Sequence, residues 1–233
     1  MTISLLNAGK RFNREWIFRH LNYDFFQGTH YAITGANGSG KSTLLQVIAG
    51  ATLHSEGEVR YEGGQGSMGN KPHAATNESL NDISKTVSVH NESGTREQKI
   101  VEPYKFLSFA APYLELVEEM TATEFLVFHS KFKHLVSGIK DILYESGLSR
   151  SSDKQIRYFS SGMKQRLKLA QAFYSDTPVL LLDEPLTNLD AEGIVLYHSL
   201  IKNHGTKRLV IISSNDEKEY DFCSEVIRIG DYK

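Results

Sequence analysis

Nine consecutive residues have the composition of a phosphate-binding loop. They read Gly35-Ala36-Asn37-Gly38-Ser39-Gly40-Lys41-Ser42-Thr43 and match the Walker A pattern G-x-x-x-x-G-K-[ST]. Glycines allow a tight curl in which successive backbone N–H groups point at one anion. Lys41 supplies a cation for the β- and γ-phosphates, and the Ser42 hydroxyl is a ligand for Mg²⁺. The stretch therefore predicts a nucleotide site that binds ATP with Mg²⁺.

The residues on either side give this loop its expected structural context. An apolar run at 31–33 leads in and is typical of a strand, and an amphipathic run at 44–49 leads out. A helix that begins at about Ser42 would aim the positive end of its dipole at the phosphates. An ordinary glycine-rich turn needs neither neighbour, so the context favours nucleotide binding.

A second group of acidic residues follows a buried strand. The all-apolar run at 179–182 is typical of a parallel strand covered on both faces, and Asp183 and Glu184 come directly after it. This is a Walker B pattern, in which Asp183 holds Mg²⁺ directly or through water. Glu184 is placed to orient or deprotonate the water that attacks the γ-phosphate.

A third candidate precedes Walker B by one helix. The segment Phe159-Ser160-Ser161-Gly162-Met163 stands before the helical run at 167–173, and either serine is a good N-cap. A plain capped helix explains this much. A helix start made of small residues is also an anion site, because its hydroxyl, N–H groups and dipole point the same way.

Together these motifs resemble the nucleotide-binding subunit of ABC transporters, whose signature reads Leu-Ser-Gly-Gly-Gln ahead of Walker B. Residues 159–163 keep the serine Ser160 and the second glycine, Gly162, and depart at the other three places. Residues 186–190, which end in Asp190, resemble the family's D-loop. Phe12 stands where the family has an aromatic residue that stacks on adenine; a strand-end core aromatic is the other interpretation. The resemblance covers nearly the whole chain except 63–102.

Two family residues are missing. No glutamine follows the strand at 107–109, where the sequence is Ala110-Ala111-Pro112-Tyr113-Leu114, and the switch histidine after the strand at 209–213 is replaced by Ser214-Asn215-Asp216. Asn215 can donate a hydrogen bond through its amide, but its side chain is shorter and carries no charge. We expect weak or partner-dependent hydrolysis by Lys41, Glu184 and Asn215, with ATP binding intact.

The elements that must position these residues fit an α/β fold. The resemblance implies a P-loop NTPase core with a parallel sheet, an N-terminal antiparallel β-subdomain and an inserted helical subdomain, all within a single ABC-type ATP-binding domain over 1–233. The sequence itself predicts a helical block at about 113–176, with helices at 115–120, 123–132, 134–145 and 162–174. Residues at about 63–102 are predicted to be a loop-like insertion. Predicted strands lie at 3–6, 17–26, 58–61, 107–109, 179–182, 208–213 and 226–229.

Bulk composition excludes several classes of protein. Hydrophobic residues make up 40% and charged residues 23%, as in ordinary globular proteins, and the net charge of −2 lacks the basic field of nucleic-acid binders. The single Cys223 excludes an internal disulfide and a cysteine-based zinc cluster. Apolar runs such as 209–212 are far too short to span a bilayer.

The resemblance implies an ATP-binding and hydrolysing subunit that powers a separate membrane permease. It implies a cytoplasmic protein, peripheral on the inner face of the cell membrane through that permease. It also implies a second ATP-binding subunit, in a homo- or heterodimer, with each ATP held between Walker A of one subunit and Ser160-Ser161-Gly162 of the other. The alternative is a soluble ABC-type ATPase acting in nucleic-acid maintenance or cofactor assembly. A small-molecule kinase or a GTPase would leave the signature segment unexplained.

Overall fold

The computed structural model describes residues 1–63, 84–88 and 102–233. Its centre is a parallel sheet of five strands in the order β6-β7-β8-β3-β9. These strands span Leu107–Ala110 (β6), Val179–Asp183 (β7), Leu209–Ser213 (β8), His30–Thr34 (β3) and Glu225–Arg228 (β9). Every neighbouring pair in this sheet is parallel. The carboxyl ends of all five strands therefore meet at one edge.

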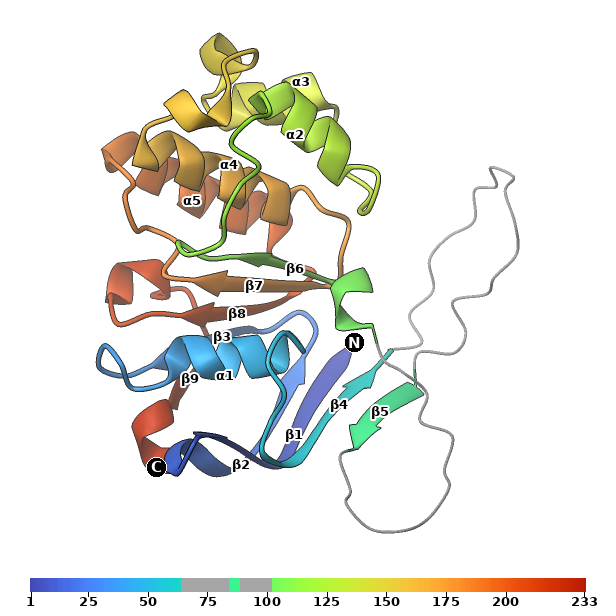
Figure 1. Cartoon of the computed structure of the whole chain (residues 1–233), viewed down its shortest axis with the longest axis vertical. Coiled ribbons are helices and arrows are strands. Elements are labelled where there is room, and N and C mark those ends of the chain that lie inside the picture. The colour runs from blue at the N-terminus through green and yellow to red at the C-terminus, as the bar shows by residue number, and fades with distance from the viewer. Residues whose placement is uncertain (64–83, 89–101) are drawn as a thin grey trace.

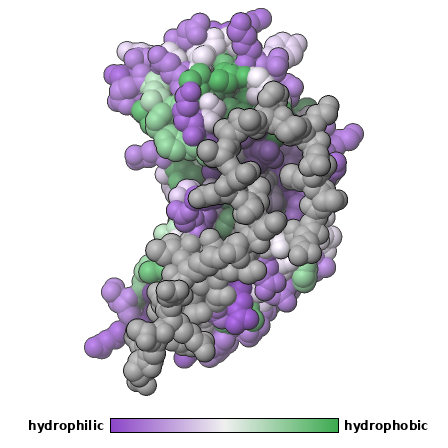
Figure 2. Space-filling view, turned by 90° about the vertical axis from the view of Figure 1, so that its right-hand side faces the viewer, coloured by the Kyte–Doolittle hydropathy of each residue, from purple (hydrophilic) through white to green (hydrophobic). Residues whose placement is uncertain are grey.

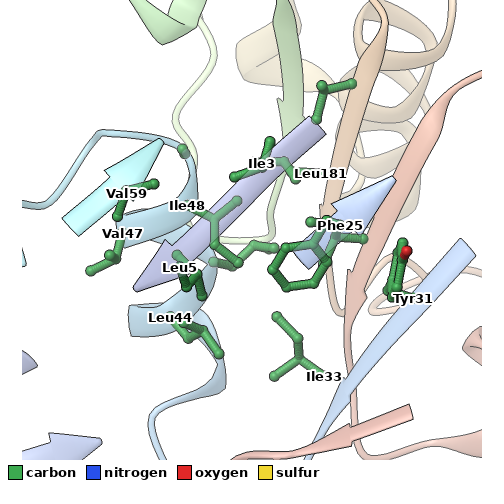
Figure 3. Close-up of a cluster of buried hydrophobic side chains, with 14 of the residues drawn as sticks. Ile3, Leu5, Phe25, Tyr31, Ile33, Leu44, Val47, Ile48, Val59 and Leu181 are labelled. Atoms are coloured by element: carbon green, nitrogen blue, oxygen red, sulfur yellow. The ribbon is translucent and has the colours of Figure 1, made fainter. Parts of the chain in front are cut away.

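Side chains of the central strands alternate between two cores. Leu181 and Ile211 belong to the core that includes α1 and the antiparallel sheet, while Leu180 and Ile212 belong to the core under the helical layer. The all-apolar run predicted as a strand covered on both faces thus has that environment, because successive strand residues point to opposite faces. Figure 3 shows the first core, where Leu44 and Ile48 of α1 face Leu5 and Ile3 of β1.

The second sheet is antiparallel, in the order β2-β1-β4-β5. It comprises β1 (Thr2–Phe12), β2 (Glu15–Phe26), β4 (Glu56–Glu62) and β5 (Ser84–Ser88). The loop-like insertion predicted at about 63–102 is wrong for 84–88, because this segment is a strand that pairs with β4. The remainder of that prediction, 64–83 and 89–101, lies outside the described residues.

The structure has the helices α1 (Lys41–Ile48), α2 (Ala122–His129), α3 (Ile139–Glu145), α4 (Ser161–Phe173) and α5 (Ala191–His204). Helix α1 begins within the phosphate loop, and α4 begins within the signature segment. Figure 1 shows α2 to α5 gathered on one side of the parallel sheet and α1 on the other, between the two sheets. The α/β class with a parallel core sheet, an N-terminal antiparallel sheet and inserted helices is confirmed.

The predicted helix at 115–120 is wrong. The carbonyls of Glu118 and Met120 accept hydrogen bonds from the N–H groups of Arg157 and Ile156, so this segment runs beside residues 155–157 without turning into a helix. Thr121 instead caps α2 with Glu124 in a reciprocal capping box. Long-range pairing has overridden local helix propensity here.

Two further differences concern helix bounds. The helix predicted at 134–145 begins only at Ile139, because Val136 N–H bonds to the Tyr174 carbonyl and Leu135 pairs with Ser175. Helix α5 has no counterpart among the predicted helices, although Ile194, Tyr197 and Ile201 have helical spacing.

Candidate nucleotide site

The phosphate loop follows β3 and ends at a position whose backbone conformation and close neighbours suit only glycine. Gly40 has φ of +106°, and a Cβ there would lie 2.3 Å from Ile17 Cγ2 on β2. The loop can therefore approach β2 closely while turning into α1, which begins at Lys41. Lys41 is buried, and its Nζ donates to the carbonyls of Gly35 at 2.9 Å and Ala36 at 3.2 Å. Its ammonium group lies across the loop that should cradle the phosphates.

The switch position is tied directly to this loop. β8 lies between β3 and β7, so the residues after β8 come out between the phosphate loop and the Walker B acids. Asn215 Nδ2 donates a 2.9 Å hydrogen bond to Asn37 Oδ1. The neighbouring Glu184 N–H donates to the Ser213 carbonyl at 2.9 Å. Asn37, Asn215 and Glu184 are thus brought together at one edge of the sheet.

The Walker B carboxylates have contrasting environments. Asp183 is 2% exposed, and its Oδ1 has no hydrogen-bond partner among the described residues. A buried carboxylate oxygen without a donor is costly unless a cation binds it, so the site fits Mg²⁺. Glu184 is more exposed and has φ of +42°, an uncommon value for a non-glycine residue. Backbone strain of this kind is typical of functional turns.

The signature segment forms the start of α4. Ser160 is the N-cap, and its Oγ accepts a 3.2 Å hydrogen bond from Met163 N–H. A Cβ on Gly162 would lie 2.9 Å from the Asn188 carbonyl, so a glycine allows the D-loop to pass this closely. Ser160 and Ser161 remain exposed. Among the described residues, no hydrogen bond joins this segment to the phosphate loop of the same chain.

Asp190 serves α5 as its N-cap. Its Oδ1 accepts from Gly193 N–H at 2.8 Å and from the Arg166 guanidinium at 2.6 Å. Both interactions lower the pKa of the Asp190 carboxyl below its usual value, and the hydrogen bond from Gly193 N–H has the larger effect. Arg166 belongs to α4, so the ion pair fixes the D-loop against the signature helix.

Phe12 is the last residue of β1 and lies opposite Glu15 of β2. Its ring is half exposed, with Lys10 Nζ 4.7 Å from the ring centroid. Ile17, two residues beyond Glu15, packs against Gly40 of the phosphate loop. The exposed ring therefore stands on the hairpin that borders the loop, and its contact with adenine stays a prediction.

Sequence reasoning missed Glu219, which joins two loops of the site. This residue is 4% exposed, and its Oε1 accepts a 2.7 Å hydrogen bond from Leu186 N–H in the segment after Walker B. Burial raises the pKa of the Glu219 carboxyl to about 7, although hydrogen bonds from Ser214 and Leu186 oppose the shift. Nothing in its local sequence, a charged run at 216–219, distinguishes Glu219 from a solvated acid.

Within 1–63, 84–88 and 102–233, no helix combines the length and apolar character needed to cross a membrane. Nor do three or more His, Cys, Asp or Glu side chains in these ranges gather into a set that could hold a metal ion without other ligands.

A parallel sheet with a glycine-rich phosphate loop after β3, a buried aspartate at the end of β7 and a glutamate directly after it defines a P-loop nucleotide-binding protein. Residues 18–187 match the family model described as ABC transporter. This match covers well over half of the chain, and the chain belongs to the ABC transporter ATP-binding family.

Relatives in bacteria agree with this membership. The chain is 28% identical over 219 residues to the ABC transporter ATP-binding protein YybJ of Bacillus subtilis, covering 93% of this chain and 86% of that protein. It is 30% identical over 221 residues to HrtA of Staphylococcus haemolyticus, whose name refers to hemin import, covering 93% and 90%. It is also similar to the lantibiotic transport protein SrtF of Streptococcus pyogenes, at 27% identity over 99% of this chain and 84% of that protein. The names of HrtA and SrtF refer to different cargoes.

Solved structures share the fold. An ABC transporter ATP-binding protein from Pyrococcus furiosus superposes with a TM-score of 0.72 at 16% identity, over the full length of both chains. A bacterial ABC transporter cassette described as dimeric superposes with a TM-score of 0.70 at 21% identity, covering 98% of this chain and 95% of the other.

Proposed function

We propose that this chain binds and hydrolyses ATP with Mg²⁺ and thereby drives a separate membrane permease. The observation that carries the proposal is the Asn215–Asn37 hydrogen bond, which joins the switch position to the phosphate loop beside Glu184. Family membership supports the ATPase activity, since the family's ATP-binding subunits are transport ATPases.

The residues have distinct roles in this chemistry. N–H groups of the loop at 35–43 and the Lys41 ammonium bind the β- and γ-phosphates. Ser42 and Asp183 would hold Mg²⁺, which neutralises charge developing on the phosphate oxygens. Glu184 accepts a proton from water as the water oxygen bonds to the γ-phosphorus and the bond to the bridging oxygen of ADP breaks. Asn215 donates its amide hydrogen to the γ-phosphate.

A second subunit completes the site. The exposed start of α4 at Ser160, Ser161 and Gly162 is an anion-binding feature that no phosphate loop of the same chain reaches. In a head-to-tail pair it faces the γ-phosphate bound by the partner, with Asp190 at the junction. The dimeric cassette with the same fold supports this arrangement. The partner is a second copy or a similar ATP-binding subunit.

In this proposal the permease docks on the side of the molecule away from the phosphate loop. A groove of about 430 Å³ lies between the end of α1, β6 and the end of α2, with Gly50, Phe109 and His129 in its lining. Exposed apolar surface is added by Val127 and Phe128 of α2 and by Phe132 and Val136 after it, and Phe132 is 72% exposed. Figure 2 looks onto this side and shows apolar surface over the helices. Exposed apolar patches of this kind mark interaction sites.

Membrane fractionation of cells that express the tagged chain with its permease tests this function. The wild-type chain should sediment with the membranes and be released by alkaline carbonate, as expected for a peripheral subunit. Phe132→Asp should move to the supernatant while still binding ATP. The control Val195→Asp, at an exposed position on α5, should stay with the membranes. A wild-type chain found only in the supernatant would contradict the proposal and favour the soluble ABC-type ATPase.

A further inference from the structure

The loop after β6 lacks the glutamine of the family, but its backbone is firmly held. Leu114 N–H donates to the Ala111 carbonyl at 3.2 Å, which closes a turn around Pro112 and Tyr113. The Pro112 carbonyl accepts a 2.5 Å hydrogen bond from Lys168 Nζ, and Lys168 is buried in α4. The turn that carries Tyr113 is therefore held by one hydrogen bond within the loop and by another from α4.

The Tyr113 ring points between β6 and α1. It lies edge-on to Phe109, with the ring centroids 6.4 Å apart. Its hydroxyl oxygen accepts a 3.2 Å hydrogen bond from Gln46 Nε2. Gln46 is four residues after Ser42, so the two side chains share one face of α1. The phenol thus lies one helical turn from the serine expected to hold Mg²⁺.

The loop that carries Tyr113 begins next to the Walker B strand. β6 pairs with β7 so that Ala110 is opposite Leu182, and the loop leaves β6 beside Asp183. Tyr113 is 47% exposed, and its partial burial together with the nearby Asp183 carboxylate raises the pKa of the phenol to about 12, although the hydrogen bond from Gln46 lowers it. Because Gln46 donates to the phenol oxygen, the phenol hydrogen is free to donate in turn. Asp183 Oδ1 is buried and has no donor among the described residues.

We propose that Tyr113 is a positioning residue for the Walker B carboxylate, with its hydroxyl donating to Asp183 and orienting it toward the metal site shared with Ser42. This inference rests on the metal role assigned to Ser42 and Asp183 under the proposed function. A phenol on the β6 loop thereby fills the place of the missing glutamine, and it acts through the carboxylate. Outer partners of metal ligands typically contribute about 10- to 100-fold to metal affinity.

Tyr113→Phe removes only the hydroxyl and tests the proposal by metal dependence. Binding of a fluorescent ATP analogue is titrated with Mg²⁺, and binding of the same analogue is measured in EDTA. The half-saturating Mg²⁺ concentration should rise about tenfold, while affinity in EDTA and the thermal midpoint stay as in wild type. The control Tyr144→Phe, which removes an exposed phenol on α3, should behave as wild type.

The possible results distinguish a failure of the role proposed for Tyr113 from a failure of the metal site itself. If wild type depends on Mg²⁺ but Tyr113→Phe has the same half-saturating concentration, Tyr113 does not position Asp183. If Tyr113→Phe weakens binding equally in EDTA, its role is general packing and the proposal fails. If wild type shows no dependence on Mg²⁺, the metal role of Ser42 and Asp183 falls, and the role of Tyr113 falls with it.

Discussion

Asn215 and Asn37 are 178 positions apart in sequence, yet their side-chain amides share a 2.9 Å hydrogen bond. Asn37 belongs to the phosphate loop, and Asn215 follows the strand next to Walker B. The bond therefore connects the position that should contact the γ-phosphate with the loop that should bind it. An uncharged amide at this place can donate a hydrogen bond but cannot supply the positive charge of an imidazolium.

Replacing Asn215 with His should raise the rate of ATP hydrolysis. One well-placed donor in the transition state contributes about 10²–10³ in rate, and the shorter asparagine is expected to supply only part of this. We expect kcat to rise at least about tenfold, with KM nearly unchanged, because the change acts on the transition state. Phosphate release under steady-state conditions measures both constants.

Asn203→His is the matched control, since Asn203 is exposed near the end of α5 and bonds only to Ser199 among the described residues. Its kcat should equal that of wild type. An unchanged kcat in Asn215→His, or brisk hydrolysis by the isolated wild-type chain, would show that Asn215 is simply a turn residue.

Glu184→Gln should produce an ATP-dependent dimer. The variant keeps the shape of the side chain but cannot accept a proton from water, so hydrolysis no longer separates the two subunits. Light scattering should report a monomer without nucleotide and a dimer with ATP and Mg²⁺. Glu119→Gln, an exposed acid outside the site, should not form a stable dimer. A Glu184→Gln variant that stays monomeric with ATP would argue against self-association.

Glu219 should make stability fall as pH rises through the acid range. Its pKa is about 7 in the folded protein and near the ordinary carboxyl value when unfolded, so the folded state binds more protons between about pH 4.5 and 7. The contribution of Glu219 to the unfolding free energy is therefore most favourable below about pH 4.5 and declines up to about pH 7.

Glu219→Gln removes this titration while its amide oxygen can still accept from Leu186 N–H. Denaturant unfolding at pH 5 and pH 7.5 should show wild type losing about 2 kcal/mol more than the variant across this interval. Other titrating groups are common to both proteins and cancel in the comparison. Parallel pH profiles would mean that the Glu219 carboxyl titrates normally.

Motifs with fixed spacing could be predicted from sequence because each residue type in them has a chemical function that depends on its near neighbours in the chain. The order of the Gly40, Asp183 and Ser160 segments was enough to predict the fold class and the family. The pairing that replaces a helix at 115–120 could not be predicted, because its partners at 155–157 are distant in sequence. Local propensity does not encode such contacts.

The supporting residues of the site were also beyond sequence reasoning. Glu219 stands in a charged run, and only the fold shows that it is buried against Leu186. Tyr113 follows a proline in the loop where the family's glutamine is missing, and the sequence gives no sign of its contact with Gln46. Helix α5 is different, since Asp190 as an N-cap and the helical spacing after it were visible.

Binding of ATP to wild type and Lys41→Ala is the measurement that tests the central claim most directly. Lys41 is buried at the start of α1 with its ammonium across the phosphate loop, so its loss removes the cation facing the β- and γ-phosphates. A charge-assisted contact of this kind is worth about 1.5–3 kcal/mol, which corresponds to roughly 10- to 150-fold in affinity. Lys131→Ala, at an exposed position after α2, is the control and should bind as wild type does. The account predicts that a fluorescent ATP analogue with Mg²⁺ binds Lys41→Ala at least about tenfold more weakly than wild type or the control. Equal affinities for all three proteins would contradict it and show that the loop at 35–43 is not the nucleotide site.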